Sequence, residues 1–358
     1  MSKFERRNIL KAGAGLAPAL FGDQALATEP TQHKGWPLVP MEGSNPLEVK
    51  VVAFTTVSKD VDASIKFYTQ VMGFELLSDS RFSETMSTAP GAGKAGRRCA
   101  LIGSPKSARG ATIRILEAAP DAEEIRPRAG GKVPPANCWD PGLLVMEGGA
   151  RDAAESYHAL ASAGTPMISP PRYYFFRAEG DRRDLDVMSY ASFGPGGEQL
   201  FITINLRNDR PEWKEPGLHT PAGGCSLVSL DQRPVEEFYL KAFGLKRTSQ
   251  MDCHQRNCNE LIGAPRETYF LWGTLGNVSM EIWEFKMPEG RLYPCALDKT
   301  GLAMITMQVK DLDKCRAMCK AAGIKPVGEG AFPIPSGIRP KGFTIQGAVG
   351  ELVEVIQA

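Results

Sequence analysis

Hydrophobic and polar positions along this chain of 358 residues switch between two spacings. Short apolar runs at residues 51–57 and 225–230 predict strands. Each run is followed by a segment whose apolar side chains recur at helical spacing, and after the first run these are Val61, Ile65, Tyr68 and Met72. The spacing predicts a helix over residues 61–71.

The strand and helix unit occurs twice. Residues 60–77 and 231–246 both carry Phe-Tyr in the middle and Gly followed by Phe or Leu near the end. The pattern Leu-Ile-Gly-X-Pro also recurs, at residues 101–105 and 261–265. An internal repeat decides the architecture before any local pattern does, and it predicts a pseudo-symmetric sheet with a site between the copies.

Two further units match each other. A helix end that finishes in Gly occurs at residues 159–164 and 318–323, and a Gly-rich turn ending in Glu occurs at 194–198 and 347–351. The chain therefore reads as four modules in the order A-B-A′-B′, each with one strand, one helix and about three strands. The expected helices span residues 61–71, 151–163, 234–242 and 312–322, and the expected last strands span 111–117, 199–204, 278–285 and 352–356.

The N-terminal segment is expected to lie outside the fold. Arg6-Arg7 precede a mildly apolar stretch, and Ala25-Leu26-Ala27 supply a small-X-small cleavage site. This order predicts a twin-arginine signal peptide over residues 1–27 and a periplasmic location, the alternative being a cytosolic basic tail. Residues 28–49 are rich in Pro, Gly and polar side chains and are expected to form a linker or tail.

The composition excludes some classes of partner. A net charge of +1 argues against nucleic acid, and the chain has no run of 18 apolar residues that would predict membrane insertion. Cys315 and Cys319 are four residues apart on a predicted helix, where Cβ atoms are roughly 5–6 Å apart. A disulfide needs roughly 3.5–4.5 Å, so these two cysteines are expected to be packed thiols.

The repeated motif resembles a known family. Residues 59–64, Lys-Asp-Val-Asp-Ala-Ser, lead into Phe67-Tyr68-X₃-Met72-Gly73-Phe74, and the first part recurs at 309–313. This pattern is similar to the vicinal oxygen chelate superfamily, which includes glyoxalase I, bleomycin-resistance proteins and extradiol dioxygenases. The resemblance implies an α+β fold of four βαβββ modules paired into two cup-shaped mixed β-sheet domains. The expected domains are residues 50–207 (modules one and two) and 223–358 (modules three and four), joined by a linker at 208–222.

In that family a metal, where present, is held by His or Gln from first strands and Glu from last strands. The matching positions in this chain are Ala53 and Arg114 in module one, Phe201 in module two, Gly224 and Glu281 in module three, and Met304 and Glu354 in module four. The resemblance thus leaves Glu281 and Glu354 as metal candidates without His partners. Two carboxylates with water suit a hard divalent ion such as Mg²⁺. The alternative is that both glutamates are polar cavity linings, or point outward after a register slip.

Other side chains offer further chemistry. His254 lies between Cys253 and Cys258, a spacing that matches no common zinc site, and it is a candidate general base. The alternative is that these residues form a disulfide or are ordinary strand residues. In the aromatic stretch of residues 170–177, Tyr173, Phe175 and Arg177 could form a wall for an aromatic or anionic ligand. The alternative for this stretch is packing under a module interface. Trp272 and Trp283 could form a similar wall in the second half.

These features support two functional interpretations. One is an exported glyoxalase- or dioxygenase-like enzyme acting on a small oxygenated or aromatic molecule by metal-assisted isomerase, lyase or dioxygenase chemistry. Its catalytic candidates are Glu281, Glu354 and His254. The alternative is a metal-free small-molecule-binding protein of the bleomycin-resistance type, which the missing His ligands favour. The substrate, the metal and the choice between a monomer and a homodimer stay open.

Overall fold

The computed structural model describes residues 37–104, 110–131, 133–178, 185–207, 213, 215, 217–253, 256–266, 268, 270–276, 278–335 and 340–357. The predicted signal peptide and His254 lie outside the described residues. The unit that begins at Pro37 contains all the elements below.

Four modules follow one another, each with a strand, a helix and three strands. Module one contains β2 (Lys50–Ser58), α1 (Val61–Lys66), which continues as a π-helical turn η1 (Phe67–Val71), β3 (Glu75–Arg81), β4 (Arg98–Gly103) and β5 (Thr112–Glu117). Module two contains β6 (Gly142–Gly149), α2 (Ala153–Ser162), β7 (Arg172–Ala178), β8 (Leu185–Phe193) and β9 (Gln199–Asn205). Module three contains β10 (Gly224–Ser229), α3 (Gln232–Phe243), β11 (Arg247–Cys253), a short α4 (Arg256–Leu261), β12 (Phe270–Leu275) and β13 (Met280–Phe285). Module four contains β14 (Gly301–Val309), α5 (Leu312–Ala321), β15 (Pro326–Glu329), β16 (Gly342–Gln346) and β17 (Leu352–Gln357).

The predicted fold class, α+β with four βαβββ modules in two curled sheets, is confirmed. Each of α1, α2, α3 and α5 begins after an aspartate whose side chain accepts a hydrogen bond from a backbone N–H of the first turn. Such an N-cap satisfies a backbone donor that has no partner within the helix. The helix α4 was not predicted, because its six residues are too few to show a helical apolar period.

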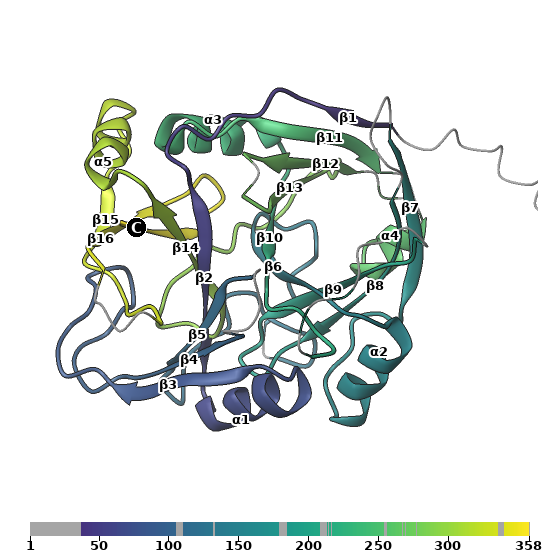
Figure 1. Cartoon of the computed structure of the whole chain (residues 1–358), viewed down its shortest axis with the longest axis horizontal. Helices are drawn as coiled ribbons and strands as arrows, with labels where there is room; N and C mark the ends of the chain where they lie inside the picture. The colour runs from purple at the N-terminus through teal and green to yellow at the C-terminus, as the bar shows by residue number, and fades with distance from the viewer. Residues whose placement is uncertain are drawn as a thin grey trace, which may run out of the picture. The chain divides into compact units, whose positions relative to one another are not determined.

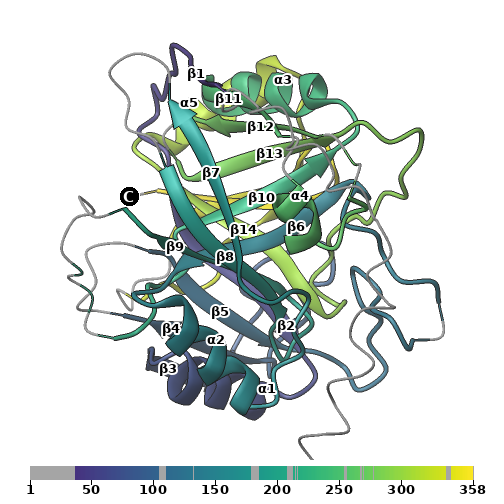
Figure 2. The same ribbon diagram turned by 90° about the vertical axis from the view of Figure 1, so that its right-hand side faces the viewer.

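The strands form two sheets (Figures 1 and 2). An open sheet has the order β15-β16-β17-β14-β2-β5-β4-β3, and a closed barrel has the order β1-β11-β12-β13-β10-β6-β9-β8-β7. The open sheet therefore combines modules one and four, and the barrel combines modules two and three. The sequence analysis expected modules one and two to pair over residues 50–207 and modules three and four over 223–358, so that pairing differs from the structure.

The difference arises from the first strands of the modules. In the open sheet β2 runs antiparallel to β14, with Phe54 opposite Ile305, and in the barrel β10 runs antiparallel to β6, with Cys225 opposite Met146. All four first strands carry similar apolar runs, so the sequence does not reveal which two will pair. The domain bounds at residues 50–207 and 223–358 stay a prediction.

The strand β1 (Pro37–Pro40) closes the barrel. It pairs antiparallel with β11 and parallel with β7. These strands belong to modules three and two, and without β1 each would present an unpaired edge. The segment expected to be a linker over residues 28–49 therefore includes one structural strand.

The repeated Phe-Tyr motif meets the repeated Gly-Glu turn. The hydroxyl of Tyr68 donates to Glu198 Oε1 at 2.6 Å, and the hydroxyl of Tyr239 donates to Glu351 Oε1 at 2.8 Å. All four side chains are buried. Burial raises the pKa of the Glu198 carboxyl and raises that of Glu351 to about 7. The motif recognised in the sequence thus serves to join module one to module two and module three to module four.

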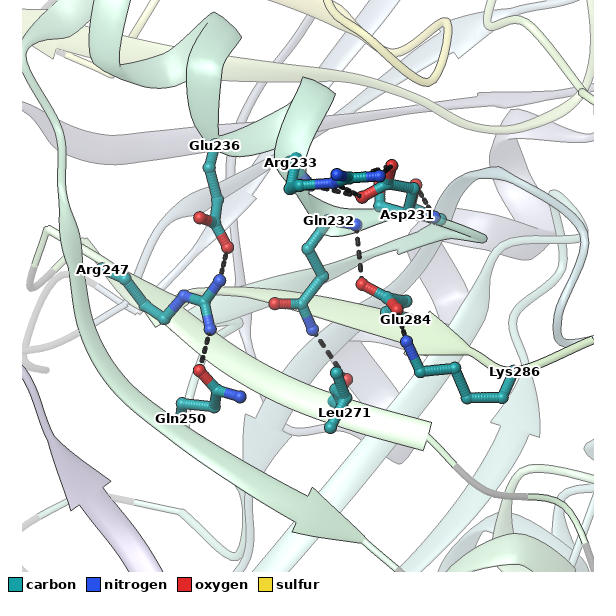
Figure 3. A network of polar contacts seen from close by, with 10 residues as sticks. Asp231, Gln232, Arg233, Glu236, Arg247, Gln250, Leu271, Glu284 and Lys286 are labelled. Carbon is teal, nitrogen blue, oxygen red and sulfur yellow. Dashed lines mark hydrogen bonds and ion pairs between the residues drawn. The ribbon is translucent and has the colours of Figure 1, made fainter.

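A polar network fixes α3 on the outer face of the barrel (Figure 3). The backbone N–H of Gln232 donates to Glu284 on β13 at 2.8 Å, and its side-chain amide donates to the carbonyl of Leu271 on β12 at 3.0 Å. Arg247 on β11 forms an ion pair with Glu236 of α3. Because side chains alternate along a strand, the anchoring of Glu284 on the outside directs Glu281 and Trp283 to the inside of the barrel.

Cys315 and Cys319 are free and buried, as expected for packed thiols. Among the described residues, no helix combines the length and the apolar character needed to cross a membrane.

Candidate functional site

The inside of the barrel holds a cavity of about 630 Å³. All strands from β6 to β13 contribute residues to its lining, and β10 does so only with Gly224. The polar lining includes Glu147 from β6, Glu281 from β13, Thr203 from β9 and Thr274 from β12. The apolar and aromatic lining includes Tyr174, Val187, Phe201, Met251, Cys258, Phe270, Trp272 and Trp283. Aromatic walls around a few convergent polar groups are typical of a small-molecule site.

Two glutamates form the polar centre of this cavity. Glu147 and Glu281 are close enough to interact, since the charge of Glu281 raises the pKa of Glu147. Ser226 of β10 donates to Glu147 Oε1, and its hydroxyl lies 3.4 Å from Glu281 Oε2. The indole N–H of Trp283 donates to the same Oε2 at 2.9 Å, and that of Trp272 donates to it as well. Glu281 thus receives most of the donors.

The surroundings of the two carboxyls determine which of them holds a proton more strongly. Burial raises the pKa of both groups, and the charge of Glu281 raises that of Glu147 further. The two indole N–H groups stabilise the ionised form of Glu281 and oppose its rise. Glu147 therefore holds its proton more strongly than Glu281 does. Such a pair titrates as one unit with two macroscopic steps.

The donor set of this pair fits a shared proton better than a divalent ion. Within the described residues, no group of three or more His, Cys, Asp or Glu side chains is gathered as a metal site would require. The two indole N–H groups that donate to Glu281 Oε2 already use lone pairs of that oxygen. A hard cation needs several oxygen lone pairs converging on it. The expected divalent ion stays a prediction.

The corresponding centre of the open sheet is closed by an ion pair. Thr55 lies opposite Arg114, and Thr306 lies opposite Glu354 in the strand register. Arg114 Nη1 lies 3.1 Å from Glu354 Oε2, and both side chains are fully buried. Phe332 covers the pair, because its backbone N–H donates to Glu354 Oε1 at 2.8 Å and its ring lies 5.1 Å from the Arg114 guanidinium. This cup is filled by the protein itself.

The structure separates the two glutamates that the sequence analysis grouped. Glu281 lies in the barrel cavity, whereas Glu354 is the ion partner of Arg114 in the open sheet. The structure therefore does not bring them into a joint site. In the strand register, the residues opposite Arg114, Glu281 and Glu354 are Thr55, Ser226 and Thr306. Each lies two residues after the first-strand position taken from the family pattern, and so on the same face of its strand.

The predicted aromatic walls are placed differently in the two halves. Trp272 and Trp283 line the cavity. On β7 it is Tyr174 that lines it, whereas Tyr173 is 40% exposed and Phe175 is not part of the lining. The sequence analysis therefore chose the wrong face of β7, because the side chain that points into the cavity is one residue away from those predicted. Arg177 belongs to β7, and its side chain is not among those that the structure describes.

Sequence reasoning missed Glu147. It lies near the end of β6, after the apolar run Leu143–Met146, where the first strand of module two was too ambiguous to align. The signal that could have found it is its position on the same strand face as Val145, directly after four apolar residues. A carboxylate on the inner face of a central strand is expected only where it has a partner.

Comparison with known proteins supports the resemblance. A model of the Glyoxalase/Bleomycin resistance protein/Dioxygenase superfamily matches residues 50–182. Glyoxalase I from Zea mays is similar in structure, with a TM-score of 0.54 and 15% identity, over 87% of this chain and 92% of that one. Its V278E mutant matches with a TM-score of 0.56 at 15% identity, over 87% and 92% of the two chains. A putative dioxygenase from Bacillus subtilis matches with a TM-score of 0.50 and 15% identity, over 86% and 84%. No curated protein sequence matches this chain.

These similarities define the class of fold. At 15% identity the structures show a shared glyoxalase-type architecture, while the family model shows that residues 50–182 carry the superfamily's sequence pattern. A fold of this kind serves many reactions, so the function must be argued from the site.

Proposed function

We propose that this chain is an enzyme that binds a small oxygenated molecule in the barrel cavity and moves a proton on it. The observation that supports the proposal is the neighbouring pair Glu147 and Glu281, in which Glu147 holds its proton more strongly, in an aromatic cavity of about 630 Å³. Two neighbouring carboxyls whose surroundings give them different pKa values are suited to act as a general acid and a general base.

The proposed step is an enolisation of a carbonyl compound, as in an isomerase or a lyase. Glu281 removes the proton from the carbon next to the carbonyl group, so a C–H bond breaks and its electron pair forms the enol. Glu147 donates its proton to the carbonyl oxygen, so an O–H bond forms. The pair has then exchanged protonation states, and return of the protons at the same or a neighbouring carbon completes the reaction. General acid–base groups in such positions contribute about 10²–10⁴-fold to a rate.

The test is exchange of carbon-bound hydrogen in D₂O for a panel of α-hydroxycarbonyl compounds, followed by proton NMR. The Glu147→Gln and Glu281→Gln variants should each slow exchange by about 100-fold or more. Glu237→Gln, on the exposed surface of α3, should exchange at the wild-type rate. Exchange that survives both cavity variants would contradict the proposal, and binding without exchange would favour the alternative, a small-molecule-binding protein. Exchange that is lost with EDTA and restored by Mg²⁺ would replace this mechanism with a metal-assisted one.

We further propose that the chain is exported by the twin-arginine route and is periplasmic, on the strength of Arg6-Arg7 and the Ala25-Leu26-Ala27 site. The Arg6→Lys/Arg7→Lys double variant should remain uncleaved in the cytosol of a bacterial host. Lys11→Arg keeps both arginines and should be exported normally. The proposal would be contradicted if the double variant were found in the periplasm at the size of the cleaved protein.

A further inference from the structure

The described wall of the barrel cavity carries acidic groups only. Its lining contains two carboxyls, Glu147 and Glu281, and, among the described residues, no lysine, arginine or histidine. The hydrogen bonds to Glu281 come from neutral groups, namely two indoles and a hydroxyl. These donors bring no positive charge to the carboxyl. A buried charge without an opposite charge is costly, and it strongly favours a cation when one is available.

Buried carboxylates elsewhere in the described residues have different partners. Glu354 has the guanidinium of Arg114 as an ion partner. Glu198 and Glu351 each accept a hydrogen bond from a tyrosine hydroxyl, and the loop of residues 347–351 leaves no space beside Glu351 for a Cβ on Gly347. Glu198 also lines a second cavity of about 550 Å³, whose described lining includes Arg126 and Arg128. The cavity of the half-buried Glu147 and Glu281 differs from it, because its described lining contains no cationic side chain.

Aromatic rings complete the surroundings of the pair. Trp283 packs edge to face against Phe201 at 5.9 Å and lies 5.8 Å from Phe270, and all three rings line the cavity together with Trp272 and Tyr174. The face of an aromatic ring carries partial negative charge and attracts a cation, most strongly in tryptophan and when water is excluded. The rings and the carboxylate therefore favour the same kind of ligand.

We propose that the molecule bound in this cavity carries an ammonium group, either a protonated amine or a quaternary ammonium, and that carboxylates and phosphates are rejected. This inference rests on the same cavity as the proposed function and specifies its ligand class. The arrival of the cation favours ionisation of Glu147, so binding at neutral pH releases a proton that a neutral ligand would not release.

The experiment compares three ligands of nearly the same shape: phenethylamine, 2-phenylethanol and 3-phenylpropanoate. Isothermal titration calorimetry on the full chain at pH 7, in phosphate and in Tris, measures affinity and proton release together. Phenethylamine should bind at least tenfold more tightly than 2-phenylethanol, and 3-phenylpropanoate should be the weakest. The binding enthalpy of phenethylamine should differ between the two buffers, whereas that of 2-phenylethanol should not.

The Glu281→Gln variant separates a charge effect from loss of folding. Its preference for phenethylamine over 2-phenylethanol should fall to less than threefold, while its far-ultraviolet circular dichroism spectrum should show that it is folded. The inference is overturned if the alcohol or the carboxylate binds the wild-type chain as tightly as the amine, or if none of the three binds. Hydrogen exchange on neutral carbonyl compounds is measured separately, so the proposed proton transfer can survive that result.

Discussion

Replacing Arg114 with methionine is expected to lower the free energy of unfolding by about 3–5 kcal/mol, because Glu354 would stay buried without its ion partner. Both side chains are fully buried, and Arg114 also donates to Thr55 Oγ1 at 3.0 Å and to the carbonyl of Pro333 at 3.2 Å. The loss should be measured by urea unfolding at pH 7. The barrel cavity lies in the other sheet, so binding of 2-phenylethanol should be unchanged.

A double variant tests whether the cost comes from the unpaired charge. Arg114→Met/Glu354→Met replaces both ions with apolar side chains of similar length, and such replacements are often neutral or stabilising. We expect it to regain most of the stability lost in Arg114→Met. If the single variant costs less than about 1 kcal/mol, or if the double variant is as unstable as the single one, the ion pair does not hold this cup closed.

The stability of the chain is expected to fall as the pH rises from about 4.5 to about 7, with Glu351 as a main cause. Burial raises the pKa of this carboxyl from 4.5 to about 7 in the folded chain. Between these values the unfolded chain has lost the proton while the folded chain keeps it, so a rising pH favours unfolding. The difference corresponds to about 3 kcal/mol, fully present below pH 4.5 and lost by pH 7. Glu198, whose pKa is also raised by burial, acts in the same direction.

The Glu351→Gln variant isolates this contribution. Glutamine still offers an oxygen to the hydroxyl of Tyr239 but does not titrate, so the unfolding free energy should depend less steeply on pH between 5 and 7. Glu237→Gln, which removes an exposed carboxylate of α3, should keep the wild-type slope. Equal slopes in wild type and Glu351→Gln would show that this carboxyl does not hold its proton in the folded chain.

The repeat predicted the fold because its motif has structural contacts. The Phe-Tyr pair and the Gly-Glu turn recur since Tyr68 and Tyr239 must reach Glu198 and Glu351. These local features fixed the modules and the positions of most helices and strands. They did not fix which modules share a sheet, because the choice between β14 and β6 as the partner of β2 depends on packing between elements distant in sequence.

The candidate site was predicted only in part for a related reason. Glu281, Trp272 and Trp283 were selected, and they lie in one cavity. Glu147 was not, because its strand carries no motif that aligns it. Glu354 fits the family pattern as well as Glu281 does, and only the three-dimensional neighbours distinguish them: Arg114 and Phe332 beside one, two indoles and a cavity beside the other.

The nested pairing of modules has a consequence for synthesis on the ribosome. The inner modules hold all the barrel strands except β1, so the barrel can be completed once residue 285 has emerged. The strand β2 must instead wait for β14, since Phe54 pairs with Ile305 about 250 residues later. At about 5–20 residues per second, its apolar side chains stay without their partner for roughly ten seconds or more. During that interval the nascent chain depends on chaperones, or on temporary contacts of its own, to keep β2 from pairing wrongly.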